Sequence, residues 1–236
     1  MNPAETNAHE RLIIALDVPS AQEALSLVEE LSRDISFFKI GLELFTAAGP
    51  DVVRAVIATG AQVFLDLKLH DIPNTVGKAV TAAAALGVRM LTLHLSGGRH
   101  MLEAAAENHG KVLLLGVTVL TSSDEASLRE TGVASSVEAQ AVRLAKLGAA
   151  AGIGGLIASP HEVRALRSAV GPTMTIVTPG VRPSWAAAND QQRFTTPAEA
   201  LGNGADYLVI GRPVTAHLDP REAVQKIIAE LNNAQT

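Results

Sequence analysis

The chain of 236 residues contains no cysteine, and it has only one tryptophan and one tyrosine. Disulfide bonds, thiolate catalysis and cysteine-ligated metals are therefore excluded, which fits a reducing compartment, and we expect a cytoplasmic protein. No apolar run approaches the roughly 20 residues that a membrane-spanning helix needs. The first ten residues are polar and include Glu5 and Glu10, so we expect no signal peptide and no membrane partner.

Basic residues are also scarce, because 19 Lys and Arg face 24 Asp and Glu, for a net charge of −5. No basic block occurs anywhere, and this argues against a nucleic-acid partner. Hydrophobic residues, in contrast, make up 47% of the chain, which is enough to bury a large core. The length fits one domain of α/β-barrel size or two small domains.

Short apolar runs rich in β-branched residues recur along the chain and predict strands. There are eight of them: Leu12–Val18, Phe37–Leu42, Val63–Leu69, Met90–Leu95, Val112–Val119, Gly155–Ser159, Thr175–Val181 and Tyr207–Ile210. The ends of consecutive runs lie between 21 residues (Ser159 to Gly180) and 38 residues (Thr121 to Ser159) apart. Each interval has room for a loop, a helix and the next strand.

Helical patterns with recognisable starts lie between these runs. Ser20 and Glu23 have the spacing of a capping box, and Ser159–Glu162 and Thr196–Glu199 combine this spacing with proline at the first helical position. Asp219-Pro220 opens the last predicted helix.

Eight strand–helix units without a break in composition predict an α/β fold, a (β/α)8 TIM barrel. We expect a single barrel domain over residues 11–236, preceded by a polar tail over residues 1–10. A doubly wound sheet is the alternative, but no G-x-G-x-x-G follows the first strand. The longest interval, with residues 121–137, predicts an extra loop or short helix after the fifth strand.

The third predicted strand carries charged residues inside an apolar run. Asp66 and Lys68 are two residues apart, so on a regular strand they share a face, opposite to that of Leu65 and Leu67. Buried charges are costly unless they are paired or used, and a structural ion pair is the simpler interpretation. Lys39, however, lies in another apolar run, and catalytic residues of barrels lie at the carboxyl ends of the strands.

The last two predicted strands end in sequences suited to phosphate. Gly180 and the pair Gly211-Arg212 combine glycines, which let backbone N–H groups approach an anion, with a permanently charged guanidinium. Barrels commonly bind phosphate between these two loops, although turn formation and a surface arginine would explain the same residues. The polar stretch Arg182–Thr195 is either a surface loop or a lid over substrate, from which Gln191 could reach a phosphate oxygen.

Several of these segments together resemble one enzyme family. They are Ala15-Leu16-Asp17, Phe38–Gly41, the motif Asp66-x-Lys68-x-x-Asp71-Ile72-x-x-Thr75, Val117–Ser122, Thr178–Pro183 and Val209–Pro213. In this order they resemble orotidine 5′-phosphate decarboxylase of the bacterial type, over nearly the whole chain. The ten-residue motif is highly specific, whereas the other segments would be weak indications alone.

The resemblance implies a lyase that converts orotidine 5′-monophosphate to uridine 5′-monophosphate and CO2, the last step of de novo UMP synthesis. It implies no cofactor, no metal, and a homodimer whose sites are each completed by the partner's loop after the third strand. The implied catalytic residues are Lys39, Asp66, Lys68 and Asp71, with Lys68 as the proton donor to C6. The implied substrate-binding residues are Asp17, Lys39, Asp66, Thr75, Thr121, Arg182, Gln191, Gly211 and Arg212.

The chain departs from the family pattern at two places, and rival functions stay open. The expected lid reads Ala188–Gln191 without the usual glycine before its aspartate, and Gly154-Gly155 replaces an aspartate–glycine pair. Hexulose-phosphate synthases and ketogulonate-phosphate decarboxylases resemble the chain in an Asp-x-Lys-x-x-Asp motif but use a Mg2+-stabilised enediolate. A catalytically silent phosphate-binding barrel is a third interpretation.

Overall fold

The computed structural model describes residues 7–189 and 195–233, in which eight parallel strands form a closed barrel. Each strand pairs with its sequence neighbours and β8 pairs with β1, so the predicted (β/α)8 TIM barrel is confirmed. The strands are β1 (Leu12–Ala15), β2 (Phe37–Gly41), β3 (Gln62–Leu69), β4 (Met90–His94), β5 (Leu113–Val117), β6 (Gly155–Ile157), β7 (Thr175–Pro179) and β8 (Tyr207–Ile210).

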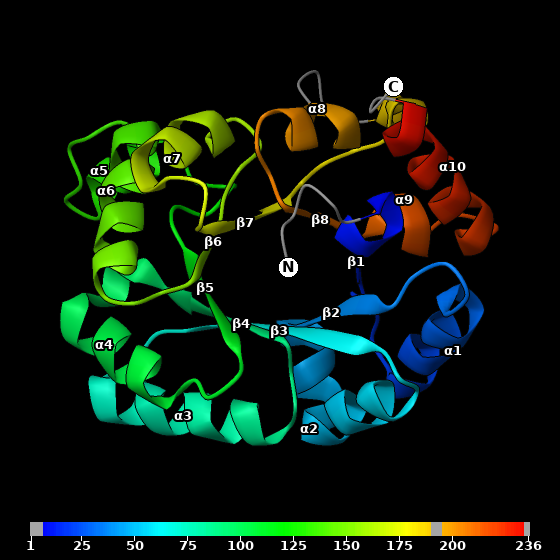
Figure 1. Cartoon of the computed structure of the whole chain (residues 1–236), viewed down its shortest axis with the longest axis horizontal. Coiled ribbons are helices and arrows are strands. Elements are labelled where there is room, and N and C mark those ends of the chain that lie inside the picture. Colours follow the sequence, from blue (N-terminus) through cyan, green and yellow to red (C-terminus); the bar gives the residue numbers. More distant parts are fainter. Residues whose placement is uncertain (1–6, 190–194, 234–236) are drawn as a thin grey trace.

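The helices lie around the outside of the barrel (Figure 1). The α-helices are α1 (Ala21–Leu31), α2 (Leu42–Ala58), α3 (Pro73–Ala85), α4 (Arg99–Asn108), α5 (Glu125–Glu130), α6 (Val137–Ala150), α7 (Val163–Val170), α8 (Pro197–Gly202), α9 (Arg212–Thr215) and α10 (Pro220–Asn233). Short 3₁₀ helices are η2 (Ala8–Arg11), η3 (Leu95–Gly97) and η4 (Ser184–Asn189). The short helix α5 fills the longest interval, as predicted.

Most of the predicted helix starts are confirmed by their capping hydrogen bonds. Ser20 Oγ accepts from Glu23 N, and a complete capping box joins Thr196 and Glu199 at the start of α8. The capping box predicted at Ser159–Glu162 is wrong. These residues form a turn, in which Glu162 N donates to Ser159 O, and α7 begins at Val163.

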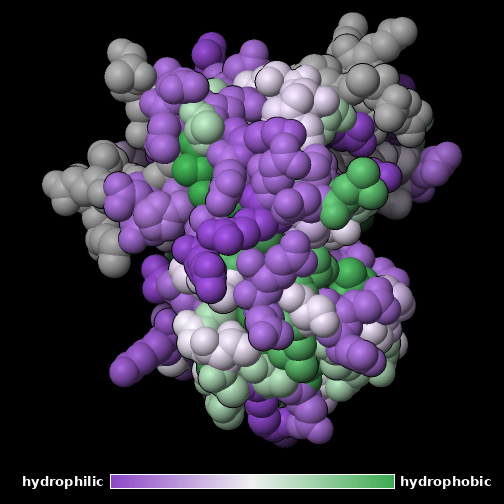
Figure 2. Space-filling view, turned by 90° about the vertical axis from the view of Figure 1, so that its right-hand side faces the viewer, coloured by the Kyte–Doolittle hydropathy of each residue, from purple (hydrophilic) through white to green (hydrophobic). Residues whose placement is uncertain are grey.

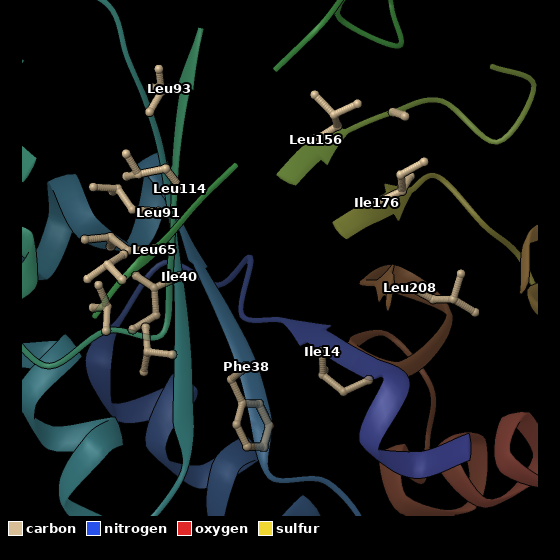
Figure 3. Packing of buried hydrophobic residues seen from close by; sticks show 14 of the residues in the cluster. Ile14, Phe38, Ile40, Leu65, Leu91, Leu93, Leu114, Leu156, Ile176 and Leu208 are labelled. Carbon is tan, nitrogen blue, oxygen red and sulfur yellow. The ribbon is translucent and has the colours of Figure 1, made fainter. Parts of the chain in front are cut away.

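Strand alternation divides the apolar residues into two layers. One faces the barrel axis and consists of Ile13, Ala15, Phe37, Phe64, Met90, Leu115, Val177 and Val209. The other lies between the strands and the helices; Figure 3 labels its members on all eight strands, among them Ile14, Phe38, Leu65 and Leu208. Because both faces of each strand are buried, the strands read as continuous apolar runs.

One strand departs from this regular alternation. Leu65 pairs with Leu91 and Leu69 with Leu93, so β3 holds two more residues than β4 between these pairs, as in a β-bulge. Lys68 lies within this irregularity with φ of 50°, and it is the one non-glycine residue with positive φ in the described ranges. The sequence had predicted a regular strand through Lys68, and that part of the prediction is wrong.

The outer surface is mainly polar, with some exposed apolar side chains. Figure 2, which faces the right-hand side of Figure 1, shows hydrophilic residues over much of this face and hydrophobic ones gathered mostly in its lower half. Within residues 7–189 and 195–233, none of the helices is long and apolar enough to span a membrane.

Candidate active site

A cavity of about 980 Å³ opens at the carboxyl ends of the strands, where barrel enzymes carry their chemistry. Eight of the predicted site residues line it: Asp17, Lys39, Asp66, Lys68, Thr121, Arg182, Gly211 and Arg212. They come from β1, β2, β3, β5, β7 and β8 or from the loops that follow these strands. The closed barrel therefore brings together residues that lie up to 195 positions apart in the chain (Asp17 to Arg212).

Carboxylates and ammonium groups alternate along one wall of this cavity. Lys39 Nζ donates to Asp17 Oδ1 at 3.0 Å and lies 3.7 Å from Asp66 Oδ2. Lys68 Nζ donates to both oxygens of Asp66, each at 2.9 Å. Each inner charge thus has a neighbour of opposite sign, which offsets the cost of removing it from water.

The four side chains in this row of charges are buried to different degrees. The side chains of Lys39 and Asp66 are 12% and 13% exposed, whereas those of Lys68 and Asp17 are 30% and 53% exposed. Lys68 therefore combines a fixed partner on the wall with an accessible ammonium group. This combination suits a proton donor to a bound molecule.

The backbone of β2 leaves room for one of these lysines. A Cβ atom at Gly41 would lie 2.9 Å from Lys39 Nζ and 3.4 Å from Asp17 Oδ1, closer than side-chain atoms can pack without moving. A glycine two residues after Lys39 therefore allows the lysine to reach along the strand to Asp17.

The loops after β7 and β8 bring the residues predicted to bind phosphate to the same cavity. Gly211 and Arg212 follow β8, and Gly180 and Arg182 follow β7. Gly180 has φ of 76°, a conformation that glycine adopts without strain. Arg182 N donates to Thr195 O at 3.1 Å, so the two ends of the predicted lid are held together. Gln191 lies outside the described residues.

Two predicted site residues do not reach the cavity of their own chain. Asp71 and Thr75 are exposed in the loop after β3 and at the start of α3, and neither lines the cavity. Asp71 Oδ1 accepts a hydrogen bond from Ile72 N at 2.6 Å, and the Ile72 side chain is 65% exposed. An exposed apolar residue therefore lies between two predicted site residues that stand outside the cavity.

Two histidines lie beside the charged row without lining the cavity. The rings of His70 and His94 have centroids 5.5 Å apart. Burial, and then the neighbouring His70 and Lys68, hold the pKa of His94 below its usual value. The His94 ring therefore stays neutral near pH 7, as expected for a histidine that packs against the site rather than one that carries charge in it.

Three cavity-lining residues after β6 were not predicted as site residues, because the sequence assigned them only to the end of a strand and the start of a helix. They are Ser159, Pro160 and His161, and they are followed by a buried carboxyl group, Glu162. Glu162 is 7% exposed, and its Oε2 has no hydrogen-bond partner among the residues that the structure describes. Burial, with a smaller contribution from Glu138, raises the pKa of Glu162 to about 7.

We expect the charge of Glu162 to make stability depend on pH. The usual pKa of a glutamate carboxyl group is 4.5, whereas that of folded Glu162 is about 7. Between these two pH values the Glu162 carboxyl group is ionised in the unfolded chain and protonated in the folded chain. The free energy of unfolding therefore falls as the pH rises through this range. Glu162→Gln removes the effect, which amounts to at most ~3 kcal/mol at pH 8. We therefore compare the melting temperature of Glu162→Gln with that of the original chain at each pH. This difference, variant minus original, should be roughly 3–10 °C more positive at pH 8 than at pH 5.

Thermal unfolding at both pH values measures this difference, with Glu30→Gln on the exposed side of α1 as the matched control. The control should show little change between the two pH values. If Glu162→Gln differs from the original chain by the same melting temperature at pH 5 and at pH 8, the Glu162 carboxyl group does not ionise between these pH values and the prediction is wrong.

Comparison with known proteins agrees with this geometry. Residues 10–227 match the family model described as orotidine 5′-phosphate decarboxylase / HUMPS family. The chain belongs to this family.

Curated relatives within the orotidine 5′-phosphate decarboxylase family match nearly the full chain. A protein of Opitutus terrae named orotidine 5′-phosphate decarboxylase is 53% identical over 226 residues, which cover 94% of this chain and 98% of that one. A protein of the same name from Syntrophotalea carbinolica is 51% identical and covers 95% and 96%. The crystal structure of orotidine 5′-phosphate decarboxylase from Lactobacillus acidophilus superposes with a TM-score of 0.84 at 35% identity, and the match covers 94% of this chain and 99% of that one.

Proposed function

We propose that this chain decarboxylates orotidine 5′-monophosphate to uridine 5′-monophosphate and CO2, the final step of de novo UMP synthesis. The observation that carries the proposal is the alternating row Asp17, Lys39, Asp66 and Lys68 in a cavity that Arg212 also lines. Membership of the family and the names of relatives that are about 50% identical support the same activity. A biosynthetic step on a nucleotide fits a cytoplasmic enzyme.

The phosphate and the ribose fix the substrate at two places in the cavity. Arg212 offers a planar, permanently charged donor group to the phosphate, beside the backbone of Gly211, and Arg182 approaches from the loop after β7. Asp17, the most exposed member of the charged row, accepts hydrogen bonds from the ribose hydroxyls. Thr121, which follows β5, contacts the pyrimidine. Phosphate binding remote from the reacting carbon can thereby contribute to catalysis through positioning.

The charged row then acts on C6 of the pyrimidine. As the C6–carboxylate bond breaks, CO2 leaves and the electron pair stays on C6 in an orbital that the ring cannot delocalise well. The Lys68 ammonium stabilises this charge and gives one proton to C6, which completes uridine 5′-monophosphate. The negative charge of Asp66 repels the substrate carboxylate, and this repulsion disappears as CO2 departs, so it favours the transition state over the ground state.

Each active site is completed by a second copy of the chain. Asp71 and Thr75 are exposed and do not line the cavity of their own chain, although the motif assigns both to the site. Two apolar side chains at the same end of the barrel, those of Leu42 and Ile72, are also exposed without lining the cavity. Burying them between two chains would place Asp71 of one subunit near Lys68 of the other and hold the Lys68 ammonium between two carboxylates.

Purified protein should consume orotidine 5′-monophosphate equally well with and without EDTA. The charged row already supplies the cation at C6, and both oxygens of Asp66 are bound by Lys68 Nζ rather than open to a metal ion. The loss of substrate absorbance is the measurement, with added Mg2+ as a further condition. Activity that EDTA abolishes and Mg2+ restores would contradict the proposal and favour the metal-dependent relatives, and no turnover at all would favour a binding protein.

A further inference from the structure

A single threonine links Asp66 and Lys68, two neighbouring members of the charged row, from behind. Thr92 lies in the middle of β4, and its side chain is fully buried. It shares the barrel-facing side of β4 with Met90, which packs into the inner apolar layer. A hydroxyl at such a position needs hydrogen-bond partners, because an unpaired buried polar group is costly.

The Thr92 hydroxyl has one partner on each of its two sides. Its oxygen accepts from Lys68 N at 2.9 Å, and the hydroxyl donates to Asp66 Oδ1 at 2.9 Å. Because the Lys68 N–H occupies the oxygen's acceptor side, the hydroxyl proton is directed at the carboxylate. Asp66 then faces Lys68 Nζ with both oxygens, each 2.9 Å away.

The same hydroxyl supports a strained backbone. Lys68 has φ of 50°, which costs free energy for a residue with a side chain, and it lies where β3 and β4 lose their regular register. The Lys68 N–H donates to the Thr92 hydroxyl, and this hydrogen bond helps to define where the Lys68 side chain starts.

We propose that Thr92 is a positioning residue that sets the geometry of the Lys68–Asp66 pair for proton transfer. It holds the Lys68 main chain and the Asp66 carboxylate through one hydroxyl and touches no part of the substrate. The inference rests on the proposed decarboxylation, since it concerns the group that gives the proton to C6. It predicts that removing the hydroxyl slows turnover while leaving the phosphate and ribose contacts intact.

The test compares substitutions that keep or remove the hydroxyl at nearly constant shape. Thr92→Val should lower kcat by roughly 10- to 100-fold with KM within about threefold, because geometry is lost in the transition state and not in binding. Thr92→Ser keeps the hydroxyl and should retain kcat within about threefold. Thr178→Val is the matched control, because Thr178 is equally buried on β7 and its hydroxyl has no partner within residues 7–189 and 195–233.

Several outcomes would overturn the inference. They are unchanged kcat in Thr92→Val, an equal loss in Thr92→Ser, an equal loss in Thr178→Val, and a loss confined to KM. If thermal unfolding shows that Thr92→Val does not fold, the smaller Thr92→Ala replaces it with the same expectations. Activity of the unsubstituted chain, measured first, separates the two proposals: inactive protein refutes the decarboxylation, whereas an active enzyme indifferent to the hydroxyl refutes only the role of Thr92.

Discussion

Lys68→Ala should lower kcat for orotidine 5′-monophosphate by about 10⁴-fold or more. In the proposed mechanism the substitution removes both the cation beside the developing charge at C6 and the proton that C6 receives. It also leaves the Asp66 carboxylate, only 13% exposed, without its closest counter-ion. No other lysine can take over, because Lys39 is held at 3.0 Å by Asp17 on the far side of Asp66.

Decay of substrate absorbance at saturating concentration measures this loss. Lys146→Ala, at an exposed position of α6, is the matched control and should keep full activity. Binding of uridine 5′-monophosphate should survive in Lys68→Ala, since the phosphate and ribose contacts remain. A kcat within about tenfold of the unsubstituted enzyme would show that the proton comes from another group.

Mixing two inactive variants should restore activity. In the proposed homodimer each site takes Lys68 from one chain and Asp71 from the other, so Lys68→Ala and Asp71→Asn should each damage every site of their own homodimers. In a heterodimer of the two variants, one site receives both substitutions and the other receives neither. Random reassociation of equal amounts should therefore recover about a quarter of the unsubstituted activity, given two-fold symmetry.

Co-expression with two different affinity tags isolates the heterodimer and removes doubt about mixing. The purified heterodimer should then reach about half of the unsubstituted activity, since one site in two is intact. Mixing Lys68→Ala with Asp66→Asn is the matched control, because both residues belong to the same chain's row of charges. That pair should recover nothing. Failure of the first pair to recover, with the heterodimer confirmed, would contradict the shared site.

Much of the fold could be predicted because strands of a closed parallel barrel are buried on both faces. The eight apolar runs correspond to the eight strands, and the excess residues at their ends, such as Val18 and Val119, fall in the loops after the strands. Capping patterns at Ser20 and Thr196 located helix starts. At Ser159 the same pattern failed, because the segment forms a turn that lines the cavity.

The site was predictable to the extent that a strand places its residues by alternation. Asp66 faces the cavity together with Lys39 and Lys68, as expected. The positive φ of Lys68 was not predictable, because it follows from the register between β3 and β4 and not from the local sequence. Thr92 could have been found from the sequence, because it is the polar residue between Met90 and His94 on the inward face of β4.

A crystal structure of the enzyme with bound uridine 5′-monophosphate tests the central claim most directly, because it shows which group faces C6. We expect Lys68 Nζ within about 3.5 Å of C6. We also expect Asp66 of the same chain on one side of that nitrogen and Asp71 of the second chain on the other. A Lys68 side chain directed into solvent, or turned to the wall away from the base, would contradict the account.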